Sequence, residues 1–281
     1  MTALHGGMGI DLEDYYHVSA FENILTEQDK ADLPSYICPA TELLLEIFAR
    51  NNIKATFFCL GLVAEAHPEL IKKIANAGHE IASHSMKHDR VRDMQPAAFQ
   101  EDVYAIKALL EDITGQKVTG YRAPSFSIGK DTPFFYECLA KAGYVYSSSL
   151  NPIQHDHYGD KDAPRHAFKV DPYDILEIPV TTTEILGRRI PTGGGGWFRL
   201  MPYMFFKSLL KRNLSEGQPL IFYTHPWEFV PEQPMIKNIP LKTRFRHYVN
   251  LSRMEAKFSS LCEDFTWGRM DQLIPKAQND F

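Results

Sequence analysis

The 281-residue chain contains few cysteines, and none of them lie close together in the sequence. The four cysteines are Cys38, Cys59, Cys138 and Cys262, and no two of them form a Cys-x-x-Cys pair. This spacing argues against a disulfide framework and against a thiolate zinc site as the basis of the fold. We expect reduced thiols that are mostly buried.

The chain also lacks an excess of positive charge and any long apolar run. Thirty Lys and Arg against 35 Asp and Glu give a net charge of -5, which offers no basic patch for nucleic acid or an anionic membrane. No stretch approaches the ~18 to 20 apolar residues of a membrane span, and no charged leader precedes an apolar run. We therefore expect no nucleic-acid partner, no transmembrane segment and a cytoplasmic location.

The sequence does contain short apolar runs that alternate with amphipathic segments. This alternation is expected of parallel strands joined by crossover helices. The predicted strands are residues 8–10, 55–60, 79–83, 120–122, 144–146, 175–180 and 220–224, and the predicted helices are 40–51, 68–78, 97–114 and 132–142. We predict a single α/β domain over residues 1–281, with a barrel-like sheet and polar residues at the strand ends.

Two histidines follow the predicted strand 79–83. His84 and His88 are four residues apart, so both imidazoles fall on one side of a turn, and imidazole is a favoured zinc ligand. Taken alone, this spacing is more often a pair of surface histidines. A metal site needs a third ligand.

An acidic cluster at the end of the first predicted strand could supply that ligand. Asp11, Glu13 and Asp14 lie within four residues, where their charges repel one another unless a cation neutralises them. On a strand, Asp11 and Glu13 face the same side, whereas Asp14 begins the loop. An isolated cluster of this kind would be better explained as an acidic cap of the following segment.

Two further strand ends carry polar residues. Arg122 lies beside Pro124, which fixes a turn, and Phe126, which could line a cleft; an Arg in this place can keep a catalytic carboxylate ionised and oriented. His225 ends the last clear strand, next to Trp227. Each feature alone is most simply structural, but together they describe a hydrolytic metal site with two histidines, one carboxylate and an open position for water.

In their order along the chain, these segments resemble the polysaccharide deacetylases of carbohydrate esterase family 4, which share the NodB homology domain. The resemblance covers about residues 10–226, and its most specific parts are Gly78–His88 and Tyr121–Pro124. It implies a distorted (β/α)7-type barrel in a single domain. The motif-bearing core would be about residues 8–228, and residues 229–281 would form a C-terminal extension packed on it.

Three segments look like a narrower subfamily, found in exopolysaccharide loci of bacteria with the PEP-CTERM/exosortase system. These segments are Ile10–Val18, Tyr121–Phe126 and His225–Glu228. The resemblance implies metal-dependent removal of N-acetyl groups from an N-acetylated polysaccharide, or its lipid-linked precursor, in exopolysaccharide biosynthesis.

The resemblance also implies roles for individual residues. Asp11 would be the catalytic base, Arg122 would orient it, His225 would be the general acid, and the metal, most simply Zn²⁺, would bind His84 and His88. The family usually has two adjacent aspartates where this chain has Asp-Leu-Glu-Asp, so we assign Asp14 as the carboxylate ligand and keep Glu13 as the alternative.

The tetrahedral oxyanion would be stabilised by the metal and by the backbone N–H after Arg122. The fourth motif of the family, which carries a tryptophan, is not evident, and Trp197 in Gly-Gly-Gly-Gly-Trp-Phe could replace it. The residues expected to contact the sugar are Tyr15, Pro124, Phe126, Trp197 and Trp227.

Two other functions remain open from the sequence. An allantoinase-like amide hydrolase of the same superfamily would use similar residues, and a carbohydrate-binding relative could keep the fold without turnover. The basic and aromatic stretch 237–248 could serve a glycan or a partner, but a loop and helix packed across the barrel explain it better.

Overall fold

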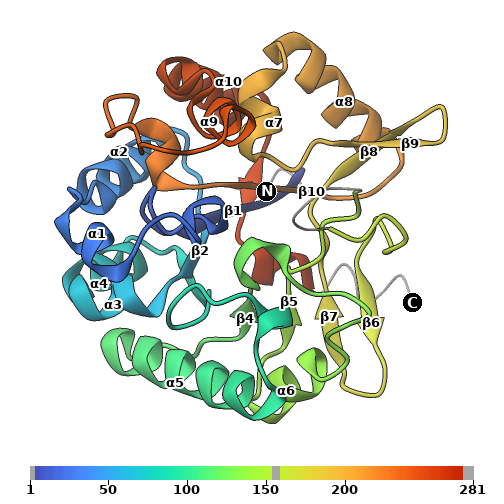
Figure 1. Cartoon of the computed structure of the whole chain (residues 1–281). Coiled ribbons are helices and arrows are strands. Elements are labelled where there is room, and N and C mark those ends of the chain that lie inside the picture. The colour runs from blue at the N-terminus through green and yellow to red at the C-terminus, as the bar shows by residue number, and fades with distance from the viewer. Residues whose placement is uncertain (1–3, 154–158, 275–281) are drawn as a thin grey trace.

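The computed structural model describes residues 4–153 and 159–274, and at its centre lies a curled, mostly parallel sheet (Figure 1). The sheet has the order β10-β1-β2-β3-β4-β5-β7-β6, and β11 pairs with the start of β1. Among the described strands of this sheet, only β6 runs antiparallel to its neighbour, at the edge beside β7. The strands are β1 (Gly6–Leu12), β2 (Thr56–Cys59), β3 (Glu80–Ser83), β4 (Gly120–Tyr121), β5 (Tyr146–Ser147), β6 (Phe168–Val170), β7 (Ile175–Glu177), β10 (Leu220–Thr224) and β11 (Trp267–Gly268).

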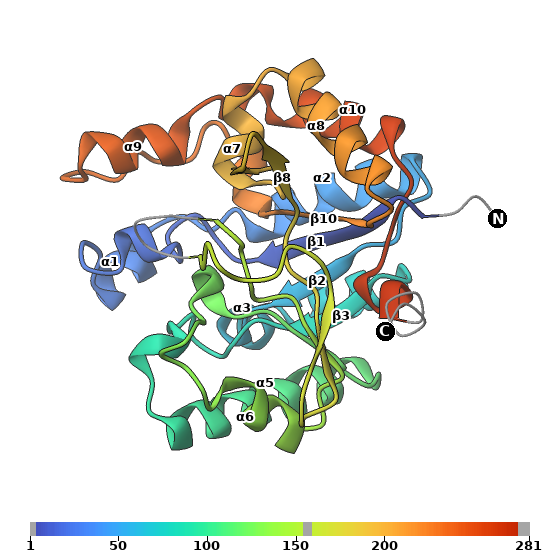
Figure 2. The same ribbon diagram turned by 90° about the vertical axis from the view of Figure 1, so that its right-hand side faces the viewer.

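Helices surround the sheet on its outer side (Figures 1 and 2). They are α1 (Glu27–Asp32), α2 (Ile37–Arg50), α3 (Gly61–Ala66), α4 (Pro68–Asn76), α5 (Pro96–Thr114), α6 (Phe135–Lys141), α7 (Gly195–Leu200), α8 (Tyr203–Ser215), α9 (Leu241–Tyr248) and α10 (Met254–Asp264). Helix α5 shows how the sequence sets their bounds. It begins at Pro96, ends before Gly115 with φ of 65°, and buries Phe99, Val103 and Ile106 on one face.

Strand β1 lies at the middle of the core and is buried along its whole length. It pairs in parallel with β10 on one side and with β2 on the other. Met8, Ile10 and Leu12 point into the main hydrophobic cluster, and the intervening residues face the inside of the barrel. Gly9 is one of these, and a Cβ atom there would lie only 2.8 Å from Nη1 of Arg122. The absence of a side chain at Gly9 is therefore what gives the Arg122 guanidinium its room.

The barrel is not closed by strand pairing between β7 and β10, as far as the described residues go. The chain after β7 spans this gap, and Thr181 N–H donates to the Ile221 carbonyl at 3.1 Å. Gly194 forms a β-bridge with Tyr223. The φ angle of Gly194 is 126°, and a Cβ atom there would lie only 1.9 Å from the backbone carbonyl oxygen of Tyr223. Between these two crossings, β8 (Thr182–Ile185) and β9 (Arg188–Pro191) form a hairpin on the outside.

The last described residues cover the end of the barrel at which the parallel strands begin. Met270 and Leu273, in the 3-10 turn Met270–Leu273, pack in a second apolar cluster inside the barrel with Phe58 and Tyr146. The backbone N–H of Met270 donates to the Thr56 hydroxyl at 2.8 Å, at the start of β2. Within residues 4–153 and 159–274, no helix is long and apolar enough to cross a lipid bilayer.

The predicted α/β barrel is confirmed, and each predicted strand and helix overlaps an observed one. The sequence pattern did not predict the strands β6 and β11, the β8–β9 hairpin or the helices α1, α3, α7, α8 and α10. Helix α9 lies within residues 237–248, where the sequence analysis expected a loop and a helix. Most of the missed elements are short or lie outside the repeating strand–helix order.

Candidate active site

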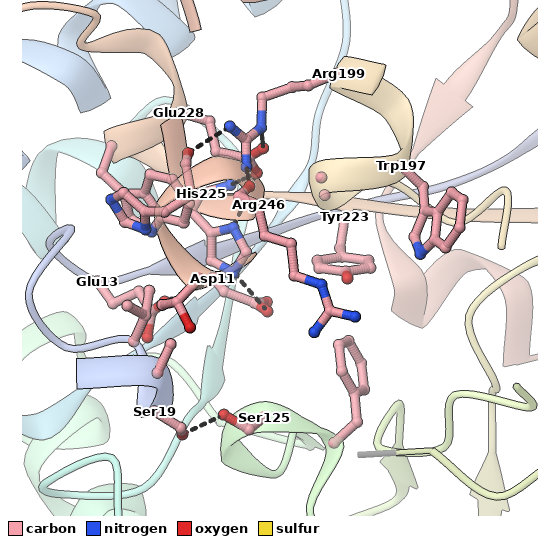
Figure 3. A pocket seen from close by; sticks show the side chains of 18 of the residues that line it. Asp11, Glu13, Ser19, Ser125, Trp197, Arg199, Tyr223, His225, Glu228 and Arg246 are labelled. Atoms are coloured by element: carbon pink, nitrogen blue, oxygen red, sulfur yellow. Dashed lines mark hydrogen bonds and ion pairs between the residues drawn. The ribbon is translucent and has the colours of Figure 1, made fainter. Parts of the chain in front are cut away.

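The functional side chains lie where the parallel strands end. Asp11 lies near the end of β1 and Glu13 just after it, His84 comes directly after β3, Arg122 after β4 and His225 after β10. All of these except Arg122, which lies behind Asp11, line a pocket of about 400 Å³, a size typical of small-molecule sites. Figure 3 shows Asp11, Glu13 and His225 directed toward one another from the adjacent β1 and β10.

Glu13, His84 and His88 form a group that could hold a metal ion. One ligand atom from each lies within 4.8 Å of the others, and Glu13 Oε2 is 2.7 Å from His88 Nε2. His84 Nδ1 donates to the Arg122 carbonyl at 2.8 Å, which leaves Nε2 as the ligand atom. Burial lowers the pKa of His84 to about 4, so the imidazole is in the neutral form that binds metal. Two imidazoles and one carboxylate are a donor set that fits a catalytic divalent ion such as zinc.

Asp14, which we assigned as the carboxylate ligand, lies outside this group. Its carboxylate accepts hydrogen bonds from the Ser35 hydroxyl at 2.5 Å and from the backbone N–H of Tyr36 at 3.2 Å. It therefore holds the loop before α2. Strand β1 ends at Leu12, and the chain turns there, since the Glu13 N–H donates to the Asp11 carbonyl at 3.0 Å. The geometry thus replaces Asp14 with Glu13.

Asp11 is held by a buried ion pair with Arg122. Arg122 Nη1 donates to Asp11 Oδ1 at 2.7 Å, and the guanidinium also donates to the Ser148 carbonyl and hydroxyl, both at 2.9 Å. The Arg122 side chain is completely buried, and its Cζ lies 4.0 Å from the centroid of the Phe58 ring. Asp11 Oδ2 lies 3.8 Å from His225 Nε2. One carboxylate oxygen is thus fixed by Arg122 while the other faces the pocket.

His225 is oriented by a buried carboxylate that the sequence analysis did not assign. Glu228 Oε1 accepts from His225 Nδ1 at 2.9 Å and from the backbone N–H of the same residue at 3.1 Å. Burial alone would lower the pKa of His225, but this hydrogen bond and the charges of Glu13, Glu228 and Asp11 raise it to about 9. The imidazole therefore carries a proton, and Nε2 presents it to the pocket.

Glu228 is neutralised in turn by Arg199 of α7. Arg199 Nε lies 2.7 Å from Glu228 Oε2, and both side chains are buried. Burial alone would raise the pKa of Glu228, but Arg199 and His225 lower it to about 2. The remaining guanidinium N–H groups of Arg199 donate to the carbonyls of Arg246, His247 and Val249. The pair therefore ties α9 to the His225 turn.

The predicted sugar contacts are only partly found at the pocket. Phe126, Trp197 and Trp227 line it; Trp197 is 40% exposed, whereas Trp227 is buried between His225 and His247, with ring centroids 5.2 and 4.4 Å away.

Two predicted contacts and one predicted hydrogen-bond donor have other places in the structure. Tyr15 is buried in an apolar cluster with Phe21, and neither Tyr15 nor Pro124 lines the pocket. The backbone N–H of Ala123, expected to meet the oxyanion, donates to the Ser149 hydroxyl at 2.9 Å. This N–H group therefore forms a hydrogen bond within the protein instead of pointing into the pocket.

Four non-glycine residues near the site have a left-handed backbone. They are Ser85, His88, Ser125 and Phe126, with φ between 49° and 68°. Such conformations cost about 1 kcal/mol each for residues with a Cβ atom. Three of them, His88, Ser125 and Phe126, line the pocket.

Comparison with known families matches two segments of the chain, and residues 1–31, with Asp11 and Glu13, lie outside both. Residues 32–147 match the family described as "Polysaccharide deacetylase", and residues 148–275 match a "Domain of unknown function". The first segment contains His84, His88 and Arg122, whereas His225, Glu228 and the residues of α7 and α9 belong to the second. The site thus draws on both segments.

Known proteins resemble the chain over part of their length. A "Peptidoglycan deacetylase" of Helicobacter pylori is 36% identical over 109 residues, which are 38% of this chain and 36% of the relative. A "Peptidoglycan-N-acetylglucosamine deacetylase" of Bacillus cereus is 31% identical over 103 residues, 37% of this chain and 36% of the relative. The matches therefore span about a third of the length of these relatives.

Solved structures show that the fold is shared. A crystal structure of a candidate polysaccharide deacetylase from Mycobacterium smegmatis has a TM-score of 0.61 and 20% identity, covering 100% of this chain and 93% of the other. Puue allantoinase also has a TM-score of 0.61, with 13% identity and coverages of 95% and 87%. The family match, the relatives and the fold together support the predicted relation to the polysaccharide deacetylases.

Proposed function

We propose that the protein is a zinc-dependent hydrolase that removes N-acetyl groups from an N-acetylated polysaccharide in exopolysaccharide biosynthesis. The observation that supports this most directly is the convergence of the Glu13, His84 and His88 group with the Asp11–Arg122 pair and with His225 in one pocket. This set contains a metal group, a base and an acid, which are the parts that amide hydrolysis needs.

The metal group would be Glu13, His84 and His88. A divalent cation bound there would lower the pKa of its water toward ~7 and polarise the acetamide carbonyl. The chain presents one carboxylate from the loop after β1 and two imidazoles from the loop after β3, with His84 fixed through its bond to the Arg122 carbonyl.

Asp11 takes the proton of the attacking water. Its Oδ1 is held in one orientation by Arg122, and its Oδ2 faces the pocket. The water oxygen then forms the new bond to the acetamide carbon.

His225 donates a proton to the sugar nitrogen as the C–N bond breaks, so that acetate and a free amine leave. Glu228 accepts from Nδ1 and thereby points Nε2 at the pocket. Trp227 lies against the imidazole ring and keeps water from that side. The exposed Trp197 offers a flat apolar face suited to a sugar ring.

The assignment of Glu13 in place of Asp14 gives a sharp test. Glu13→Gln should lose bound zinc, measured by mass spectrometry of the metal after dialysis, and should lower acetate release at least ~10²-fold. The matched control Asp14→Asn should keep its metal and most of its activity. A Glu13→Gln protein that keeps full zinc content would contradict the proposed ligand set.

Substrate class is tested by release of acetate from an N-acetylhexosamine oligomer, compared with ring opening of a cyclic ureide. The proposal expects acetate release that a chelator abolishes and zinc restores. Ring opening without acetate release would favour the allantoinase-like alternative. Stoichiometric zinc with neither reaction would favour a carbohydrate-binding relative.

A further inference from the structure

One wall of the pocket consists of residues from the segment that matches the domain of unknown function. Helices α7 and α9 contribute side chains to this wall, and Figure 2 shows α9 extending outward from the body of the molecule. The side chains of these helices that matter here are Trp197 and Arg199 from α7 and Lys242, Phe245 and Arg246 from α9. The metal group and Asp11 line the same pocket.

Helix α9 brings two cations to the pocket lining, Lys242 and Arg246. Two carboxylates of the lining already have buried partners, since Asp11 pairs with Arg122 and Glu228 pairs with Arg199. Lys242 and Arg246 each have a further interaction within the protein.

Arg246 is presented from a fixed backbone. Arg199 donates to the Arg246 carbonyl at 3.1 Å and to the neighbouring His247 carbonyl at 2.6 Å. The His247 ring stacks on the Trp227 ring, with the ring centroids 4.4 Å apart. Its Nε2 forms a hydrogen bond with Oε1 of Gln233 at 2.9 Å. Figure 3 draws the Arg246 side chain among the residues that line the pocket, which include Tyr223 and Asp11.

Two aromatic residues accompany these cations. Trp197 is 40% exposed and Phe245 is 57% exposed, and both line the pocket. Exposed rings beside cations are typical of a surface that contacts the flat face of a sugar and an attached charged group. A guanidinium matches the geometry of carboxylate and phosphate groups with two parallel N–H donors.

Resting on the proposed deacetylase function, we propose that α9 selects an acidic glycan. The N-acetyl sugar would be held at the metal group while Arg246, supported by Lys242, binds an anionic group, a carboxylate or a phosphate, on the adjoining residue. Trp197 and Phe245 would contact the sugar rings. The domain of unknown function thereby supplies substrate selection as well as His225.

The test compares three oligosaccharides of equal length. One contains only N-acetylglucosamine, one alternates N-acetylglucosamine with glucuronic acid, and one is an N-acetylglucosamine oligomer with a terminal phosphate. The zinc-loaded wild type is compared with Arg246→Gln and with Arg244→Gln, an exposed arginine on the same helix that does not line the pocket. Acetate release gives kcat and KM, and titration calorimetry gives oligosaccharide binding at low and high salt.

We expect the wild type to prefer one of the acidic oligomers and Arg246→Gln to lower kcat/KM on it by about 10- to 100-fold, mainly through KM. For the neutral oligomer, Arg246→Gln should lower kcat/KM far less. Arg244→Gln should have the kcat/KM of the wild type on all three oligomers. The preferred acidic oligomer identifies carboxylate or phosphate as the anion.

Two results would overturn the proposal: a wild type that prefers the neutral oligomer, or an Arg246→Gln protein affected equally on all three. If no oligomer releases acetate, the deacetylase function fails. Calorimetry still decides this inference in that case, because weaker and less salt-sensitive binding of an acidic oligomer by Arg246→Gln supports it, and unchanged binding refutes it.

Discussion

Replacing Glu228 with Gln removes one charge from the buried chain of interactions behind His225 while keeping the shape of the side chain. Glu228 Oε1 accepts from His225 Nδ1 at 2.9 Å, and Oε2 lies 2.7 Å from Arg199 Nε. The substitution therefore changes two things at once, the proton affinity of His225 and the neutralisation of Arg199.

The first effect is on the pH dependence of turnover. A hydrogen bond to a charged group contributes about 1.5–3 kcal/mol, which corresponds to about 1 to 2 pKa units. The carboxylate raises the pKa of His225, so its loss lowers that pKa. The acid form then disappears at lower pH, and the alkaline limb of the kcat profile should move down by about 1 to 2 pH units.

The second effect is on stability, because Arg199 would keep its charge in a buried place. Breaking a buried ion pair by removing one partner costs about 3–5 kcal/mol, and urea unfolding measures this loss. The double variant Arg199→Met/Glu228→Gln should recover part of the stability but none of the pH shift. An alkaline limb that stays in place in a folded, zinc-loaded Glu228→Gln protein would refute the proposed role of His225 as acid.

Two further predictions concern the inside of the barrel. Gly9→Ala puts a Cβ atom 2.8 Å from Arg122 Nη1, so we expect the guanidinium to shift from Asp11 and kcat to fall by about 10- to 100-fold at unchanged zinc content; wild-type kcat would show that Arg122 need not be held there. Glu80 lies at the other end of the barrel, where burial and then Asp271 raise its pKa to about 7 from 4.5. The folded state thus binds a proton more tightly than the unfolded state, and this contribution to stability, up to about 3 kcal/mol, is present below about pH 4.5 and lost as pH rises through 7. Unfolding of wild type and Glu80→Gln at pH 5 and pH 8 should show a fall in wild-type stability that the variant lacks, and parallel behaviour of the two proteins would rule this out.

Much of the barrel could be predicted because its strands and helices have strong periodic patterns. Strand β1 and helix α5 follow local rules, with apolar residues at the required spacing and a proline or glycine at the helix ends. The hairpin β8–β9 and helix α9 have no such pattern, since β9 is half-exposed and α9 buries only His247. Their positions depend on contacts with distant segments.

The same distinction applies to the candidate site. His84 and Arg122 could be located from sequence because each directly follows a strand, and His88 because it lies four residues after His84. The choice between Glu13 and Asp14 depended on where β1 ends, and the sequence analysis assigned Asp14 with Glu13 as the alternative. Arg199 lies in helix α7 and follows no strand of the main sheet, so no local pattern pointed to its ion pair with Glu228.

Strand β1 has one consequence for how such a protein can change over time. It lies between β2, from the first matched segment, and β10, from the second, so its hydrogen bonds join both segments through the centre of the core. A recombination event that exchanged one segment for that of a distant homologue would have to preserve the strand pairing along both edges of β1. We therefore expect the two segments to be inherited together, as one unit of evolution.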